Sequence, residues 1–259
     1  ALLIPLLFVP ELYFHIFIGV LIGLAAREFV NMVVASGRGR LGALLYTGGF
    51  ALILYVAMLT AYQGHLDVMW VVALLIGALL SGVTLVVFSV FNYENFTRFF
   101  LSLLYISVTF FSISLLRANG INVLLYLLIL SMVTDIFAYF VGMRFGKTKL
   151  APIISPKKTV EGFVGGTLIA ALTATVYAIL TGLFTEMGLL GVLIVFLMGW
   201  IVAMSAQVGD LFASSMKRHY DIKDFSNLLP GHGGVLDRLD STLFAALVLA
   251  VALFLYGGI

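Results

Sequence analysis

The stretch from Gly188 to Ala213 reads GLLGVLIVFLMGWIVAMSAQVGDLFA, and its single charged residue is Asp210. A run of about 20 apolar residues is long enough, as a helix, to cross the hydrocarbon layer of a bilayer. Within lipid every backbone polar group must find its partner inside the protein, which favours a helix over irregular chain. The stretch therefore predicts a transmembrane helix that carries a carboxylate about one turn before its polar end.

Similar apolar runs recur along the whole chain of 259 residues, which is 63% hydrophobic and 10% charged. Soluble domains are about 25% charged, and the chain lacks the alternating ~10-residue segments of a membrane β-barrel. With no cysteine, disulfides and thiolate chemistry are excluded. We therefore predict an all-α fold, a polytopic transmembrane bundle of about nine segments, at residues 1–9, 12–35, 43–62, 68–91, 99–115, 121–142, 162–184, 188–213 and 241–257.

Positive charge alternates between the loops that connect these segments. One set of loops carries twelve basic residues, and the opposite set carries only Arg117. Basic loops stay in the cytoplasm, so the N-terminus is expected inside and the C-terminus outside. The twelve residues are Arg38, Arg40, Arg98, Arg144, Lys147, Lys149, Lys157, Lys158, Lys217, Arg218, Lys223 and Arg238.

Three regions with different roles are expected along the chain. Residues 1–91 would be N-terminal membrane helices that shape a lateral entrance for lipid, and residues 92–142 would be central helices. Residues 143–259 hold both long polar loops and would form the catalytic region. Both loops lie on the same side of the membrane by the charge alternation, so they could build one site.

Asp210 is the first candidate functional residue, because a carboxylate within an apolar span is costly and marks a functional site by default. Ser214 and Lys217 follow it at spacings of four and seven residues, which places the three on one helical stripe. An alternative is a structural ion pair of Asp210 with Lys217 or with an arginine of another helix.

A glycine-rich loop opens the last span. It reads GHGGVLDRLDS from Gly231 to Ser241, and glycines let backbone N–H groups approach an anion. Carboxylates beside backbone donors and cations suit a complex of a metal with a polyphosphate. Since cysteine is absent, oxygen ligation by Mg²⁺ is favoured over zinc.

A second intramembrane carboxylate, Asp135, lies within the sixth span, and the other polar loop follows with five basic residues and Glu161. This loop could close over phosphates, or its lysines could only attract anionic lipid headgroups. Asp135 could pair with a basic residue or help to hold a second ion. Glu161 could be a first-turn charge that complements a helix dipole.

The polar windows resemble the signature of the phosphatidate cytidylyltransferase (CDP-diacylglycerol synthase) family. The matching residues are Ser214, Met216, Lys217, Arg218, Lys223, Asp224, Ser226, Leu229, Pro230, His232, Gly233, Gly234, Val235, Asp237, Arg238 and Asp240. The stretch SPKKTVEG at 155–162 and the pair Gly209-Asp210 are similar to further landmarks of that family. One departure is Ala213, where many members carry an acidic residue.

The resemblance implies transfer of CMP from CTP to phosphatidic acid, with Mg²⁺ required and pyrophosphate released. It also implies an integral bacterial or organellar membrane enzyme, here expected in the bacterial inner membrane with its site facing the cytoplasm. A homodimer is expected, with CTP, phosphatidic acid and membrane lipid as partners and no nucleic acid.

Roles for individual residues follow from this reading as hypotheses. Asp210 and Asp237 would hold Mg²⁺, with Asp240 and Asp224 as second choices and a second cation nearby. The triphosphate and the lipid phosphate would contact Lys217, Arg218, Lys223 and Arg238, while Ser214 would bind at the metal or a phosphate. His232, Gly233 and Gly234 would contact phosphates, and Lys157 and Lys158 would cover the nucleotide.

Two rival functions remain open at this point. A transporter for an anionic solute would use Asp135 and Asp210 as an ion path, although no internal repeat is visible. A CTP-dependent polyprenol or phytol kinase would release CDP instead of pyrophosphate. A CDP-alcohol phosphotransferase is excluded because its pattern needs an Asp-Gly pair, which does not occur in this chain.

Overall fold

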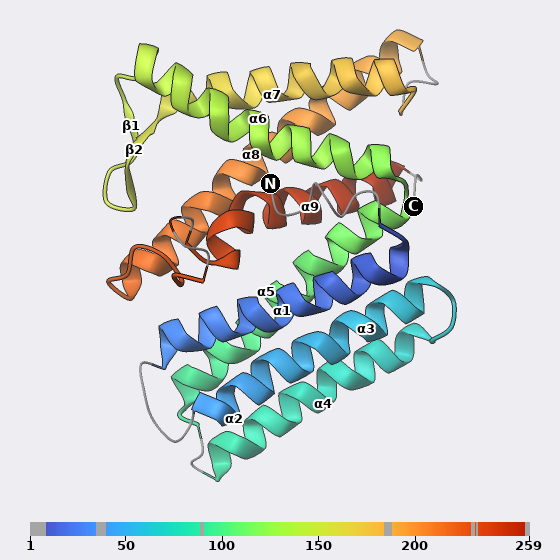
Figure 1. The fold of residues 1–259 in the computed structure, drawn as a ribbon, viewed down its shortest axis with the longest axis vertical. Helices are drawn as coiled ribbons and strands as arrows, with labels where there is room; N and C mark the ends of the chain where they lie inside the picture. The colour runs from blue at the N-terminus through green and yellow to red at the C-terminus, as the bar shows by residue number, and fades with distance from the viewer. Residues whose placement is uncertain are drawn as a thin grey trace. The chain divides into compact units, whose positions relative to one another are not determined.

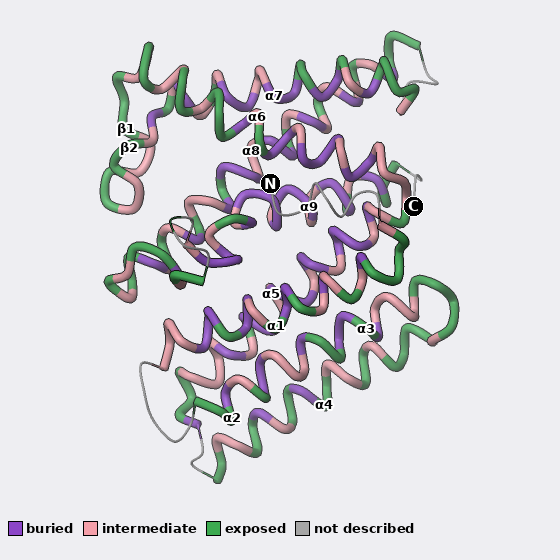
Figure 2. Tube along the Cα trace, viewed as in Figure 1, coloured by how far each residue is buried: buried purple, intermediate pink, exposed green. Residues whose placement is uncertain are grey.

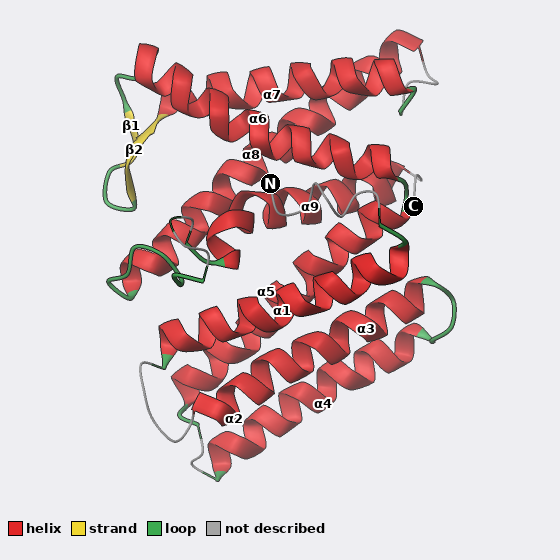
Figure 3. Ribbon diagram, viewed as in Figure 1, coloured by secondary structure: helices red, strands yellow, loops and turns green. Residues whose placement is uncertain are grey.

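The computed structural model describes residues 9–34, 40–88, 91–183, 188–228, 231 and 233–256. Within these ranges, eight helices are long and apolar enough to cross a membrane, and Figure 3 shows helix along most of the trace. The all-α class is therefore confirmed, and the chain is an integral membrane protein. The predicted segment at 1–9 lies outside the described residues except for Val9.

The chain divides into two compact units. The first comprises residues 1–114 and 224–237, and the second comprises residues 115–223 and 238–259. This division differs from the three regions expected from the sequence. Those regions were defined by role, and their roles stay predictions.

The first unit is a set of apolar helices. It contains α1 (Glu11–Val33), a helix that runs from α2 (Arg40–Leu44) through the π-helical turn η2 (Leu45–Gly49) into α3 (Phe50–Tyr62), α4 (Val68–Val87) and most of α5 (Tyr93–Ala118). The α1 side chains Phe14, Ile18 and Ile22 are fully buried, whereas α4 is largely exposed (Figure 2). An exposed apolar helix of this length suits a lipid environment.

A polar relay crosses the core of this unit. The Tyr55 hydroxyl on α3 lies 3.1 Å from His15 Nδ1 on α1 and 2.8 Å from Ser114 Oγ on α5. Buried polar groups are costly unless they are hydrogen-bonded, and these satisfy one another. His15 is thus a packing residue of this unit.

The second unit contains α6 (Ile121–Phe145), α7 (Val160–Thr181), α8 (Gly188–His219) and most of α9 (Val235–Tyr256). Helices α6 and α7 lie side by side (Figure 1). Their close packing depends on the small residues Gly162 and Gly166, since a Cβ added to Gly166 would lie 2.6 Å from the backbone nitrogen of Ala138. Small residues four apart bring helices together in this way within membranes.

The basic loop between α6 and α7 is a β-hairpin, which the sequence reading did not predict. Strands β1 (Lys149–Ala151) and β2 (Ser155–Thr159) pair antiparallel. Thr159 caps α7 by accepting a hydrogen bond from the Gly162 N–H at 3.1 Å. Glu161, in the first turn of α7 as predicted, accepts the N–H groups of Lys147 and Thr148 at 3.1 Å each. The base of the hairpin is therefore fixed to the start of α7.

Candidate active site

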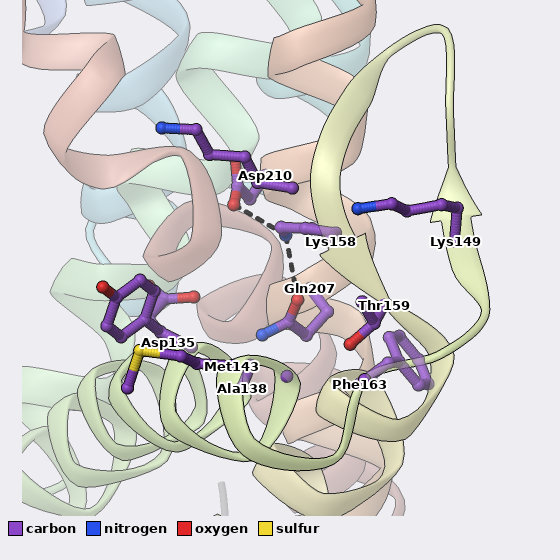
Figure 4. Close-up of a pocket in the computed structure, with 13 residues that line it drawn as sticks. Asp135, Ala138, Met143, Lys149, Lys158, Thr159, Phe163, Gln207 and Asp210 are labelled. Atoms are coloured by element: carbon purple, nitrogen blue, oxygen red, sulfur yellow. Dashed lines mark hydrogen bonds and ion pairs between the residues drawn. The ribbon is translucent and has the colours of Figure 1, made fainter.

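The second unit contains a cavity of about 560 Å³ that is lined by both charged and apolar side chains. Its walls are the last turns of α6, the β-hairpin, the start of α7 and the polar part of α8, as Figure 4 shows. The cavity therefore lies where three apolar helices meet the basic hairpin. The lining residues that carry charge or an amide are Asp135, Lys149, Lys157, Lys158, Gln207 and Asp210.

Lys158 on β2 links the hairpin to α8. Its Nζ lies 2.6 Å from Asp210 Oδ2 and donates to Gln207 Oε1 at 2.9 Å. The two ion-paired side chains are only 19% and 28% exposed, and Gln207 is buried. A partly desolvated pair of this kind fixes both partners more firmly than a surface ion pair does. Figure 4 shows Lys149 pointing toward the same space from β1.

Asp210 is one of three carboxylates that lie close together. Asp135 on α6 and Asp240 on α9 are both close enough to Asp210 for their charges to interact. Asp135 accepts a hydrogen bond from Ser241 Oγ at 3.0 Å, and Asp240 accepts the Ser241 N–H at 2.9 Å. Like charges in a low-dielectric setting repel, so this cluster calls for cations. Lys158 and the buried Lys217, which interacts with Asp240, supply part of that charge.

Gly209 explains how α8 and α9 bring two of these carboxylates together. A Cβ on Gly209 would lie 2.7 Å from the backbone oxygen of Asp240 and 2.8 Å from Phe244 Cβ. Only a glycine leaves room for this approach of the α9 backbone. Next to it, Ser214 Oγ donates to Asp210 Oδ1 at 3.3 Å, which confirms that Asp210 and Ser214 share a helical face.

Asp237 lies in the first unit, where it closes the glycine-rich loop. Its Oδ2 accepts the N–H of Phe225 at 2.7 Å and the N–H of Gly234 at 2.9 Å. Gly233 has a φ of +78° and lies directly against this side chain. Asp237 and Asp210 belong to different units, so their predicted convergence on one ion stays a prediction.

The remaining predicted residues are placed as follows. Arg218 donates to the backbone oxygen of Ile222 at 3.0 Å, so its guanidinium closes the turn that ends α8. Lys223, Asp224 and Arg238 are exposed. His232 lies outside the described residues.

Two polar residues that contact charged groups of the site escaped the sequence reading, and a common signal marks both. Gln207 carries a side-chain amide within an apolar span. It lies three residues before Asp210 and hence on the same helical face. Ser241 follows Asp240 and contacts two of the carboxylates. The common signal is a polar side chain inside a membrane span, which indicates a pathway or site. Hydropathy alone does not detect a single serine or glutamine.

The donor set suits a magnesium ion only in part. Carboxylate oxygens are the ligands that Mg²⁺ prefers. Among the residues that the structure describes, however, no group of three or more His, Cys, Asp or Glu side chains is arranged to hold a metal ion by itself. Mg²⁺ commonly takes one or two carboxylates and completes its shell with water and substrate phosphates, and Asp210 with Asp240 or Asp135 fits that arrangement.

Comparison with known proteins finds cytidylyltransferases each time. The sequence model of the Cytidylyltransferase family matches residues 1–256. A phosphatidate cytidylyltransferase of Bacillus subtilis is 41% identical over 176 residues, which are 67% of this chain and 64% of that protein. One from Staphylococcus saprophyticus is 36% identical over 163 residues, 63% of this chain and 61% of that protein.

A longer match extends over both units. A phosphatidate cytidylyltransferase of Staphylococcus aureus is 31% identical over 259 residues, which are 96% of this chain and 93% of that protein. The matches with the Bacillus subtilis and Staphylococcus saprophyticus proteins span less than two thirds of those relatives' lengths.

Proposed function

Since the chain belongs to the cytidylyltransferase family, we propose that it transfers CMP from CTP to phosphatidic acid at the cytoplasmic membrane interface. The products are CDP-diacylglycerol and pyrophosphate. The observation that carries this proposal is the cavity between α6, α7 and α8, where three lysines and a group of carboxylates meet at the end of apolar helices. A polar site at that position suits one substrate that arrives from water and one that stays in lipid.

The chemistry needs little proton transfer. A phosphate oxygen of phosphatidic acid, already anionic, attacks the α-phosphorus of CTP, and a new P–O–P bond forms. The bond from that phosphorus to the oxygen that bridges the α- and β-phosphates breaks, and pyrophosphate leaves with this oxygen and the electron pair. The main barrier is the approach of two polyanions, so charge neutralisation and in-line positioning supply the catalysis.

The cavity residues divide this work between them. Three lysines face the phosphate groups and lower the repulsion between the substrates. They are Lys149, Lys157 and Lys158. Asp210, with Asp240 or Asp135 beside it, would hold Mg²⁺. The Ser214 hydroxyl donates a hydrogen bond to Asp210. When bound, Mg²⁺ neutralises triphosphate charge and orients the phosphates. A second cation beside this cluster and a homodimeric assembly belong to the same proposal.

The lipid substrate defines the remaining expectations. Its acyl chains stay in the bilayer, and a lateral opening bordered by the N-terminal helices would admit its headgroup. The basic hairpin and the end of α8 would face the cytoplasm by the distribution of positive charge, in a bacterial inner membrane.

The position of a phosphorus label tests the reaction directly. With the purified protein in mixed micelles of detergent and phosphatidic acid, CTP labelled in the α-phosphate is expected to label the lipid, because CMP is transferred. CTP labelled in the γ-phosphate is expected to yield labelled pyrophosphate and unlabelled lipid. Label passing from the γ-phosphate to the lipid, with release of CDP, would instead establish a lipid kinase, and uptake of CTP or phosphate into vesicles without any cleavage would establish a transporter.

Asp237 can be tested separately as a metal ligand. The oxygen of an asparagine can still accept the N–H groups of Phe225 and Gly234, so Asp237→Asn removes the charge and preserves the loop. If Asp237 binds Mg²⁺, transfer is expected to fall about tenfold or more, with a higher Mg²⁺ concentration needed for half-maximal rate. Near-normal activity in Asp237→Asn would limit Asp237 to closing the loop.

A further inference from the structure

Glu28 on α1 is a buried carboxylate that the reaction does not use. It is 3% exposed, and its partners lie about 200 residues later in the chain. Ser226 Oγ donates to Oε1 at 2.7 Å, the Val235 N–H donates to Oε1 at 2.8 Å, and the Leu236 N–H donates to Oε2 at 2.9 Å. Both carboxylate oxygens are therefore engaged by one segment of the first unit.

These contacts make Glu28 the cap of another helix. The first N–H groups of a helix have no partner within it, and they are normally satisfied by a side chain just before the helix. At the start of α9 the caps are Asp237, which takes the Gly234 N–H, and Glu28, which takes the next two N–H groups. A carboxylate at this end of a helix is also favoured by the helix dipole.

The glycine-rich loop is shaped around Glu28. A Cβ on Gly234 would lie 2.5 Å from Glu28 Oε1 and 2.7 Å from Oε2. Any other residue at this position would push the carboxylate away from the backbone N–H groups. The second of the paired glycines thus has a reason in packing against Glu28, separate from the phosphate contact expected from its sequence.

From this geometry we infer that Glu28 is a positioning residue for the transferase, because it holds Ser226 and the first turn of α9. That turn carries Asp237 and Arg238, and Asp240 follows on the same helix. The inference rests on the proposed function for its effect on catalysis. It gives α1 a role in holding the start of α9 that hydropathy does not reveal.

A purely structural role is the competing explanation, and burial of the charge argues against it. Helices pack in membranes through apolar and small residues, and a buried carboxylate is expensive unless it is fully hydrogen-bonded. A buried carboxylate is therefore expected where it fixes the conformation of polar backbone, and not where it only fills space. Among the residues that the structure describes, its three hydrogen-bond partners are all in the segment that carries the family signature.

Hydrogen exchange tests the positioning without any assay of activity. In the full-length protein in detergent, Glu28→Gln and Ser226→Ala are expected to speed amide exchange in peptides that cover 225–237, because the N–H groups of Val235 and Leu236 lose their acceptor. The effect of Ser226→Ala should be smaller, since it removes one contact of three. Tyr55→Phe is the matched control, because it removes buried hydrogen bonds that join α3 to α1 and α5 and removes no contact of Glu28.

The transfer assay then measures the consequence. Glu28→Gln is expected to lower kcat by about 10- to 100-fold, the range typical of groups that orient a metal ligand, with a smaller change in the KM for CTP. Gln keeps one acceptor oxygen, so Glu28→Ala should be more impaired than Glu28→Gln. Adding Ser226→Ala to Glu28→Ala should cost little more, because residues that act through one contact are not additive.

The outcomes separate this inference from the proposed function. A wild-type protein that transfers no CMP would contradict the function, while the exchange experiment would still decide whether Glu28 holds the loop. An active wild type with Glu28→Gln indistinguishable from Tyr55→Phe in both exchange and kcat would overturn the inference. So would unchanged exchange at 225–237 in Glu28→Gln and Ser226→Ala.

Discussion

Replacing Asp210 with asparagine is expected to lower CDP-diacylglycerol formation by at least about 100-fold, since even groups that only orient a metal ligand contribute about 10- to 100-fold. Asp210 is in contact with Lys158 and Ser214 and lies beside Asp135 and Asp240. Asparagine has nearly the same shape but no charge. It would weaken the attraction for a divalent cation and release Lys158 from its ion pair.

The measurement is a titration of Mg²⁺ at saturating CTP for wild type and Asp210→Asn. A higher Mg²⁺ requirement together with the lower rate is the expected signature of a lost metal ligand. Glu94→Gln is the control, because it breaks the surface ion pair of Glu94 with Arg98 on α5, 3.6 Å long, and should leave the rate within about twofold, as surface pairs contribute about 0–1 kcal/mol. An Asp210→Asn protein with normal rate and normal Mg²⁺ dependence would remove Asp210 from the catalytic site.

The helices could be predicted from sequence because lipid imposes a simple rule. A helical membrane span is about 20 residues long, so apolar runs such as 188–213 predicted the eight helices among the described residues that are long enough to cross a membrane. Polar ends were less predictable. Helix α8 continues through six polar-rich residues to His219, since a helix does not stop where its side chains become charged.

The ion pair of Lys158 with Asp210 could not be predicted from the sequence. The charge pattern offered Lys217 as a partner for Asp210, whereas the structure pairs Asp210 with a lysine 52 positions earlier, on a hairpin strand. Periodicity fixes which face of a helix a residue occupies, but the partner across a loop depends on tertiary packing. The strands themselves are short, and β propensity is weak and depends on context.

Glu28 illustrates a different limit of sequence reading. A carboxylate in an apolar span is unusual, yet its hydrogen-bond donors are two backbone N–H groups and one serine hydroxyl. Because these partners are backbone groups and a hydroxyl, no basic residue in the sequence indicates what Glu28 binds. The signal that could have led to them is the pair of glycines before α9, because Gly234 leaves space for a side chain from elsewhere in the fold.

Replacing Lys158 with methionine is expected to raise the KM for CTP by about 10- to 100-fold, because hydrogen bonds to charged groups contribute about 1.5–3 kcal/mol. Methionine keeps most of the apolar stem and removes the ammonium group. The lysine lines the cavity and is held by Asp210 and Gln207, so its charge is already oriented before a triphosphate enters. A contact present in both bound substrate and transition state raises KM with a smaller effect on kcat.

The dependence on Mg²⁺ distinguishes this variant from Asp210→Asn. Without Lys158, the carboxylate of Asp210 keeps its negative neighbours Asp135 and Asp240 but loses its nearest cation. Its attraction for a divalent ion should therefore be equal or stronger, and half-maximal rate should need no more Mg²⁺ than in wild type. Lys147→Met is the matched control, because it removes a charge from the same loop outside the cavity lining. An unchanged KM for CTP in Lys158→Met would confine this lysine to holding the hairpin against α8, whereas a joint rise in KM and in Mg²⁺ requirement would show that the pair acts through the metal site alone.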